Sequence, residues 1–121
     1  MLTPGTVFPK PCETMSLIDN LQAMLARGQD SALLRYGLGN EYLKAEQPAA
    51  AAEHLAEAVR QDPTYSAAWK LYGKALAALS RHAEALDVFD QGIAAAERKG
   101  DLQAAKEMRV FRKRSETAIT S

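Results

Sequence analysis

The sequence predicts an all-α protein, a right-handed stack of antiparallel helix-turn-helix pairs with about six helices. Residue sizes repeat at an interval of 34 positions, and from Ser16 onward apolar side chains recur at helical spacing. Hydrophobic residues make up 47% of the 121 positions, and alanine, the strongest helix former, dominates them. A stack of this kind presents an extended surface, which bears on function as well as on fold.

Two segments carry the repeat, residues 32–65 and 66–99. Their literal identity is low, but small residues recur opposite small ones and large residues opposite large ones. The matched positions are Leu38-Gly39 with Tyr72-Gly73, Tyr42 with Leu76, Ala51 with Ala85, Leu55 with Phe89, and Val59 with Ile93. A size pattern with this period is typical of stacked helical or strand repeats that pack mainly on their neighbours.

The first fifteen residues differ from the remainder, because they hold three of the five prolines and no periodic apolar pattern. Proline fixes φ and removes a hydrogen-bond donor, so we predict a disordered N-terminal arm over residues 1–15. Met15 directly precedes the first helix signal. We therefore expect residues 1–14 to be upstream sequence or a dispensable leader.

Helix start and stop signals divide the rest of the chain. Ser16 followed three positions later by Asp19 resembles a capping box, and Gly28 ends the helix that it opens. Pro48 suits a first helical position, and Gly100 stops the longest helix before Asp101 caps the last one. The expected helices cover about residues 16–28, 31–45, 48–61, 65–79, 82–98 and 101–118. Short connections between them predict antiparallel hairpins.

These residues resemble the tetratricopeptide repeat family, a helix-turn-helix unit of 34 residues, in the form of a small bacterial protein. The second repeat carries the front of the motif in Trp69, Tyr72-Gly73, Leu76, Ala85 and Phe89, and the first carries its back in Leu38-Gly39, Tyr42, Ala51, Leu55, Ala58 and Pro63. Three positions depart from it: Arg35 replaces a large aromatic residue, Gly92 an alanine and Glu97 the terminal proline. Without that proline, we expect the fifth helix to run one turn longer.

The flanks are expected to complete the array, because two repeats alone are usually too few for stability. Shifted back by 34 residues, the helix in 16–28 aligns with the second half of a repeat. Shifted forward, the helix in 101–118 aligns poorly, as expected of a solvent-facing capping helix. The chain is thus predicted to contain a half-repeat, repeats at 32–65 and 66–99, and a cap.

No constellation of catalytic, cofactor-binding or metal-binding residues is present in the sequence. His54 and His82 lie 28 residues apart without cysteine or paired acids at ligand spacing, and no Gly-rich loop has phosphate-cradling order. We expect a non-catalytic protein without cofactors, and both histidines at the surface. The sequence predicts a cytoplasmic protein without membrane contact. Its single cysteine, Cys12, cannot form an internal disulfide, and it has neither a secretory signal nor an apolar run long enough to span a membrane. Its 15 basic residues balance its 15 acidic ones, so the molecule as a whole has no charge that would attract a membrane.

The resemblance implies that the first helix of each repeat lines a concave groove that binds protein segments. One stripe on these helices keeps register at intervals of four and 34, and its members form our predicted protein-binding site: Tyr36, Asn40, Lys44, Lys70, Lys74, Met108 and Arg112. Its basic, partly apolar character suits a peptide with acidic side chains or a free C-terminal carboxylate. Only Asn40 matches the carboxylate clamp of chaperone-binding relatives. The alternative interpretation is an ordinary solvated face.

Two further interpretations remain open. Residues 98–114 hold seven basic residues against two acids, so the last helix could approach nucleic acid, although its lack of aromatic residues other than Phe111 favours a merely charged cap. Self-assembly into a homo-oligomer is the other alternative, since an incomplete stack leaves apolar ends.

Overall fold

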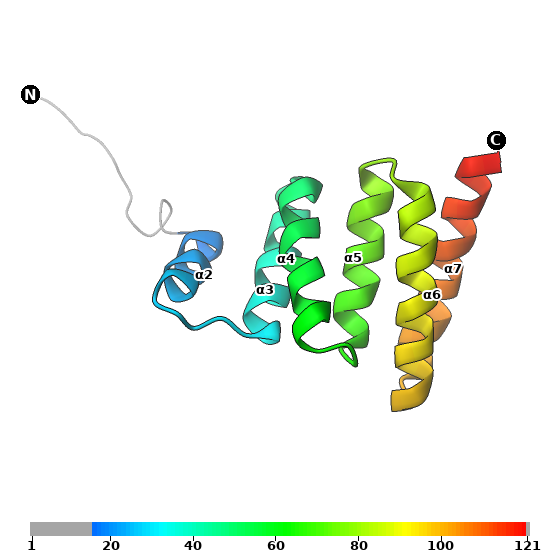
Figure 1. The fold of residues 1–121 in the computed structure, drawn as a ribbon. Coiled ribbons are helices and arrows are strands. Elements are labelled where there is room, and N and C mark those ends of the chain that lie inside the picture. Colours follow the sequence, from blue (N-terminus) through cyan, green and yellow to red (C-terminus); the bar gives the residue numbers. More distant parts are fainter. Residues whose placement is uncertain (1–15, 121) are drawn as a thin grey trace, which may run out of the picture.

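The computed structural model describes residues 16–120, which form six α-helices and no strand (Figure 1). The helices are α2 (Leu17–Ala26), α3 (Ala32–Lys44), α4 (Pro48–Gln61), α5 (Ser66–Ala78), α6 (His82–Lys99) and α7 (Leu102–Thr120). The predicted all-α fold is confirmed. The arm predicted for residues 1–15 lies outside the described residues.

The helices begin and end where local chemistry requires. Ser16 and Asp19 form a capping box, in which the Ser16 hydroxyl accepts from the amide of Asp19 and the Asp19 carboxylate accepts from the amide of Ser16. Gly28 follows α2 with φ +86°, and Gly100 caps α6 with φ +83°. These are left-handed conformations that glycine adopts without steric cost. Pro48 stands in the first turn of α4.

From α3 to α7, consecutive helices pack as antiparallel neighbours in a row (Figure 1). The extensive interfaces join α3 to α4, α5 to α6, and α6 to α7, and α4 contacts α5 between the two hairpins. The first helices of the repeats also touch, α3 on α5 and α5 on α7, so together they form one side of the stack. Figure 1 shows α2 at one end of this row and α7 at the other.

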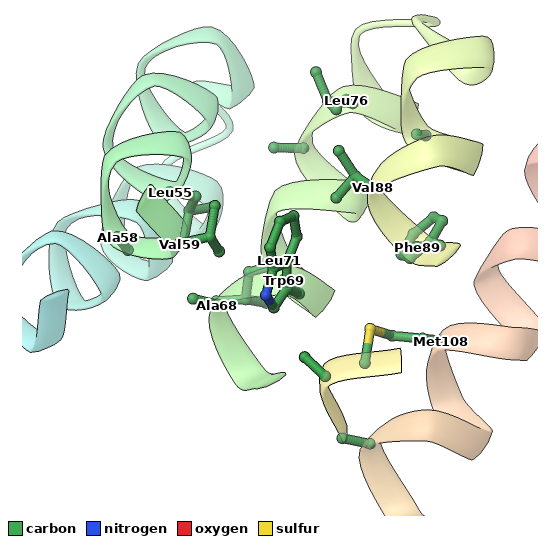
Figure 2. Close-up of a cluster of buried hydrophobic side chains, with 14 of the residues drawn as sticks. Leu55, Ala58, Val59, Ala68, Trp69, Leu71, Leu76, Val88, Phe89 and Met108 are labelled. Atoms are coloured by element: carbon green, nitrogen blue, oxygen red, sulfur yellow. The ribbon is translucent and has the colours of Figure 1, made fainter. Parts of the chain in front are cut away.

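The core follows the interfaces between hairpins (Figure 2). Its largest fully buried apolar side chains are Phe89, Leu38, Leu55, Leu76 and Met108. Trp69 is 8% exposed, and its indole N–H donates to the carbonyl of Pro63, 2.8 Å away, so the ring is buried without an unsatisfied donor. Small residues allow the close approach, since a β-carbon on Gly39 would overlap the side chain of Leu55.

The longer fifth helix is confirmed, and its extra length shifts the start of α7. The helix α6 ends at Lys99 and is separated from α7 by two residues only, so α7 begins at residue 102, 36 residues after α5 begins at residue 66. An α-helix turns about 100° per residue, so this two-residue delay turns the side-chain pattern of α7 by roughly 200° relative to a strict 34-residue repeat. The extrapolation of the 34-residue pattern onto α7 was therefore wrong.

A polar cluster attaches α2 to the first repeat. Gln22 of α2 donates to the hydroxyl of Tyr42 at 3.0 Å, and Tyr42 stacks on His54 with ring centroids 5.5 Å apart. Arg35 donates from Nη1 to Nδ1 of His54 at 3.1 Å and from Nε and Nη2 to both carboxylate oxygens of Asp30, at 2.9 and 3.0 Å. Arg35, the departure from the family aromatic, thus joins the α2–α3 loop to α4.

The contacts of this cluster define the protonation state of His54. Arginine carries donors only, so Nδ1 of His54 is the unprotonated acceptor of the imidazole ring. Burial, followed by the charge of Arg35, lowers the pKa of His54 below its ordinary value. The expectation that His54 is an ordinary surface histidine was wrong, because it is half-buried and neutral within a bonded cluster. His82 is likewise half-buried, near Ser115.

Candidate binding surfaces on the inner helices

The structure separates the predicted stripe into two places. Tyr36 and Asn40 of α3 lie in a groove between α2 and α3. Lys70 and Lys74 of α5 lie on the side of that helix that faces α7. Lys44, at the end of α3, is exposed and donates to Glu41 at 3.1 Å.

The groove between α2 and α3 encloses about 700 Å³, and most of its lining is apolar. It is lined by Leu17, Leu21, Met24, Gln29, Asp30, Ser31, Leu33, Leu34, Tyr36, Gly37, Asn40 and Glu41. Leu17 is 53% exposed and Leu33 is 70% exposed, which leaves apolar surface of this groove in solvent. The site arises because α2 contacts α3 over only a small area, with Leu21 near Gly37.

Tyr36 connects this groove to the second repeat. Its ring lies 5.0 Å from that of Tyr65, measured between centroids, and Tyr65 is the residue that precedes α5. Both tyrosines are half-buried, and burial raises the pKa of the Tyr65 phenol. The pair therefore forms an aromatic surface at the junction of α3 and α5.

Lys70 is engaged by its neighbour in the structure. Its ammonium group donates to a carboxylate oxygen of Glu107 on α7 at 2.6 Å, and this bond lowers the pKa of Glu107. The same carboxylate accepts from Gln103 at 3.0 Å. Lys70 therefore contributes to the α5–α7 contact and offers a partner less net charge than the sequence suggests.

Lys74 lies in a second, smaller pocket between α5, α7 and the start of α6. The pocket encloses about 340 Å³ and is lined by Lys74, Ala77, Ala78, His82, Phe89, Phe111, Arg114 and Ser115. Lys74 and Arg114 both lie over the ring of Phe111, at 5.0 and 5.4 Å from its centroid. These distances are within the range of cation–π attraction.

Met108 and Arg112 do not lie where the 34-residue interval placed them. Met108 is completely buried, packed against Gly92, so its prediction as exposed groove surface was wrong. Arg112 points toward α6, where it donates to Asp90 at 2.6 Å, and it also pairs with Glu116 at 3.6 Å. The Asp90 bond raises the pKa of Arg112. Both displacements result from the delayed start of α7.

The residues that α7 does present to α5 were not predicted from the sequence. Glu107 bonds to Lys70, Phe111 packs near Lys74, and Arg114 lines the second pocket. Leu17 and Leu33 were missed at the other end of the array.

The basic last helix is largely occupied by internal contacts. Arg109 is bonded to Glu97, Arg112 to Asp90, and Arg114 lies over Phe111. These are the three arginines on which the nucleic-acid alternative depends. In the described part of the chain, no group of three or more histidine, cysteine or acidic residues is arranged to hold a metal ion. Within residues 16–120, none of the helices has the length and apolar character required to cross a membrane.

Comparisons with known proteins agree with this architecture. Residues 36–101 match the family model described as "Tetratricopeptide repeat". A "TPR repeat-containing protein" of Pseudomonas aeruginosa is 51% identical over 104 residues, which are 86% of this chain and 99% of that protein. These findings cover most of the chain.

Solved structures show the same arrangement of helices. A Bordetella parapertussis protein solved in solution has a TM-score of 0.74 at 44% identity, over 85% of this chain and 90% of the other. The crystal structure of a tetratricopeptide repeat domain protein from Salinibacter ruber has a TM-score of 0.66 at 29% identity, over 71% of this chain and 97% of the other. Repeats of this kind are protein-interaction modules and are generally non-catalytic. The chain belongs to the tetratricopeptide repeat family.

Proposed function

We propose that the protein is a non-catalytic cytoplasmic adaptor that binds a segment of a partner protein along the inner helices α3 and α5. The observation that carries the proposal is the apolar groove between α2 and α3, which contains two residues of the predicted site, Tyr36 and Asn40. Ligand sites are typically concave and mostly apolar, with a few polar groups that fix orientation.

Each element of this surface has a distinct role in the proposed complex. Leu17 and Leu33 would be covered by apolar side chains of the partner, since together they leave apolar surface in water. The Asn40 side-chain amide, which can both donate and accept, suits the peptide backbone of an extended segment. Lys74 supplies positive charge on the side of α5 that faces α7, which suits a partner that carries acidic groups.

A pair of matched variants tests the groove. Leu33→Asp places a charge in the groove, whereas Leu102→Asp places the same charge on α7, outside both pockets on the inner helices. The two leucines are 70% and 69% exposed and both lie in the first turn of a helix, where an acid is compatible with the helix dipole. We expect Leu33→Asp to lose partners in a pull-down identified by mass spectrometry, and Leu102→Asp to retain them.

The outcome that contradicts the proposal is retention of the same partners by both variants, with circular dichroism showing both to be folded. Reversal of Lys70 is unsuitable for this purpose. Lys70→Glu would set two carboxylates together on α5 and α7, because Glu107 lies 2.6 Å from the Lys70 ammonium group, so lost binding would not distinguish the groove from the fold.

A further inference from the structure

The pocket between α5, α7 and the start of α6 has a chemistry unlike that of the α2–α3 groove. Two permanent cations, Lys74 and Arg114, line it together with His82 and Ser115, and none of its lining residues is acidic. Both cations lie within 5.4 Å of the centroid of the same phenyl ring. Two like charges held beside one apolar ring create a local excess of positive potential.

The surroundings of this pocket leave the two cations available. Lys70, Arg109 and Arg112 each bond to a carboxylate of a neighbouring helix. Within residues 16–120, Lys74 and Arg114 have no ion pair in the structure, and their described contact is the face of Phe111. Lys106 and Lys113 of α7 also have no ion pair among the described residues, but they lie outside the pocket, so Lys74 and Arg114 are the two unpaired cations that line it together.

His82 and Ser115 add a neutral donor to the two cations. Their side chains lie 3.3 Å apart, from Nδ1 of His82 to the Ser115 oxygen. If Nδ1 donates to the serine, the hydroxyl hydrogen is available to a ligand; if the hydroxyl donates to Nδ1, the ring hydrogen on Nε2 is available instead. Either arrangement leaves one donor unused. Ser115 is 2% exposed and His82 is the first residue of α6, so both are fixed by the fold.

We propose that this pocket, defined by Lys74, His82, Arg114 and Ser115, binds a phosphoryl group. A phosphate monoester carries about −1.5 to −2 charges at neutral pH and three acceptor oxygens, which matches two cations and one neutral donor. A carboxylate has one charge and two oxygens, so it would leave a cation unmatched. The start of α6 adds the partial positive charge of a helix N-terminus. This inference goes beyond the proposed groove and does not depend on it.

The test is a titration of the full-length, nitrogen-15-labelled chain with inorganic phosphate at pH 7.5, followed by NMR at constant ionic strength. We expect saturable shifts of the Arg114 Nε–H and of the amides at the start of α6. The double variant Lys74→Gln, Arg114→Gln should raise the dissociation constant at least tenfold. The control variant Lys106→Gln, Lys113→Gln removes the same charge from exposed positions of α7 and should bind as the unmodified chain does.

Three results would overturn the proposal: acetate binding as tightly as phosphate, shifts that do not saturate, or equal affinity in the double variant and its control. Circular dichroism of each variant shows whether it is folded, so loss of binding is not mistaken for loss of structure. Parallel titrations with a phosphoserine peptide and with a sugar phosphate then identify the source. Tighter binding of the peptide assigns the pocket to phosphorylated proteins, and tighter binding of the sugar phosphate assigns it to a metabolite. Retention of phosphate binding by Leu33→Asp would show that the two sites are separate.

Discussion

Gly73 of α5 lies against the ring of Phe89 of α6, and a β-carbon at position 73 would be 2.7 Å from Cδ1 of that ring and closer still to Cε1 and Cζ. Real β-carbons essentially never approach so closely. Phe89 is completely buried, so any shift of the ring would disturb its packing in the core. The contact fixes the distance between the two helices of the second repeat.

Gly73→Ala is therefore expected to destabilise the protein by about 1–3 kcal/mol, the usual cost of overpacking a core, despite the better helix propensity of alanine. Urea unfolding measures the effect. Gly37→Ala is the matched control, since the nearest atom to its β-carbon is Leu21 Cδ1 at an ordinary 3.6 Å. There the propensity gain of about 0.5–1 kcal/mol should remain. Stabilisation by both variants would contradict the close contact.

Met108→Ala tests the observed register of α7. Met108 is fully buried and its sulfur packs on Gly92, so truncation removes apolar contacts and leaves a cavity beside a residue without a side chain. A loss of about 2–5 kcal/mol in the free energy of unfolding is expected. Val110→Ala, at a residue that is 47% exposed, should cost less than about 0.5 kcal/mol. A larger loss at Val110 than at Met108 would favour the strict 34-residue register instead, because that register aligns Val110 with the buried Leu76 and Met108 with the exposed Lys74.

The His54 cluster predicts a pH dependence of stability. The pKa of His54 is lowered in the folded state, so the unfolded chain binds a proton more readily. Stability from the neutral ring is then complete above about pH 6.5 and is lost as the pH falls toward and through the lowered folded-state pKa. Melting temperature measured from pH 8 to pH 5 should decline in the unmodified protein.

His54→Gln should remove most of that decline, because glutamine does not titrate in this range. The carboxylates of Asp30 and Glu57 do not interfere, since their arginine bonds lower both pKa values to about 2. Their contribution is lost only in more acidic solution, below the ordinary carboxylate pKa. An unchanged pH profile in His54→Gln would assign the decline to other groups.

The Lys70–Glu107 bond is expected to orient α7 on α5. Glu107→Lys sets two ammonium groups together and should lower the melting temperature, whereas the exchange Lys70→Glu with Glu107→Lys should recover part of the loss. The recovery should shrink at 1 M salt, where charges are screened within about 3 Å. No recovery by the exchanged pair would mean that the bond does not orient the helices.

The sequence was sufficient to predict the fold because packing size is a local property. Gly39 and Gly73 are small where helices meet, and Leu55 and Phe89 are large where the space is filled. The signals that end a helix were also local. Glu97 in place of the family proline and the glycine at position 100 predicted the longer α6. These residues act through their own conformational preferences, which need no knowledge of distant partners.

The site was predicted less completely, because its charges depend on contacts between distant residues. Tyr36, Asn40 and Lys74 do line pockets, whereas Lys70 is paired across 37 positions and Arg112 across 22. Such pairings depend on how one helix is rotated against another. Leu33 was not predicted because a hydrophobic residue at helical spacing is ordinarily assigned to the core.

The extra turn of α6 has a consequence for how surfaces diverge among small proteins of this kind. Lengthening α6 and shortening the connection after it leaves every amino acid of α7 unchanged. It nevertheless changes which residues of α7 are buried and which are exposed to solvent. Met108 buried, Arg112 bonded to α6, and Glu107 opposite Lys70 are the results of that one alteration in length. A two-residue insertion or deletion before α7 could thus give the inner side a new charge and shape at once, which point substitutions would need many separate steps to reach.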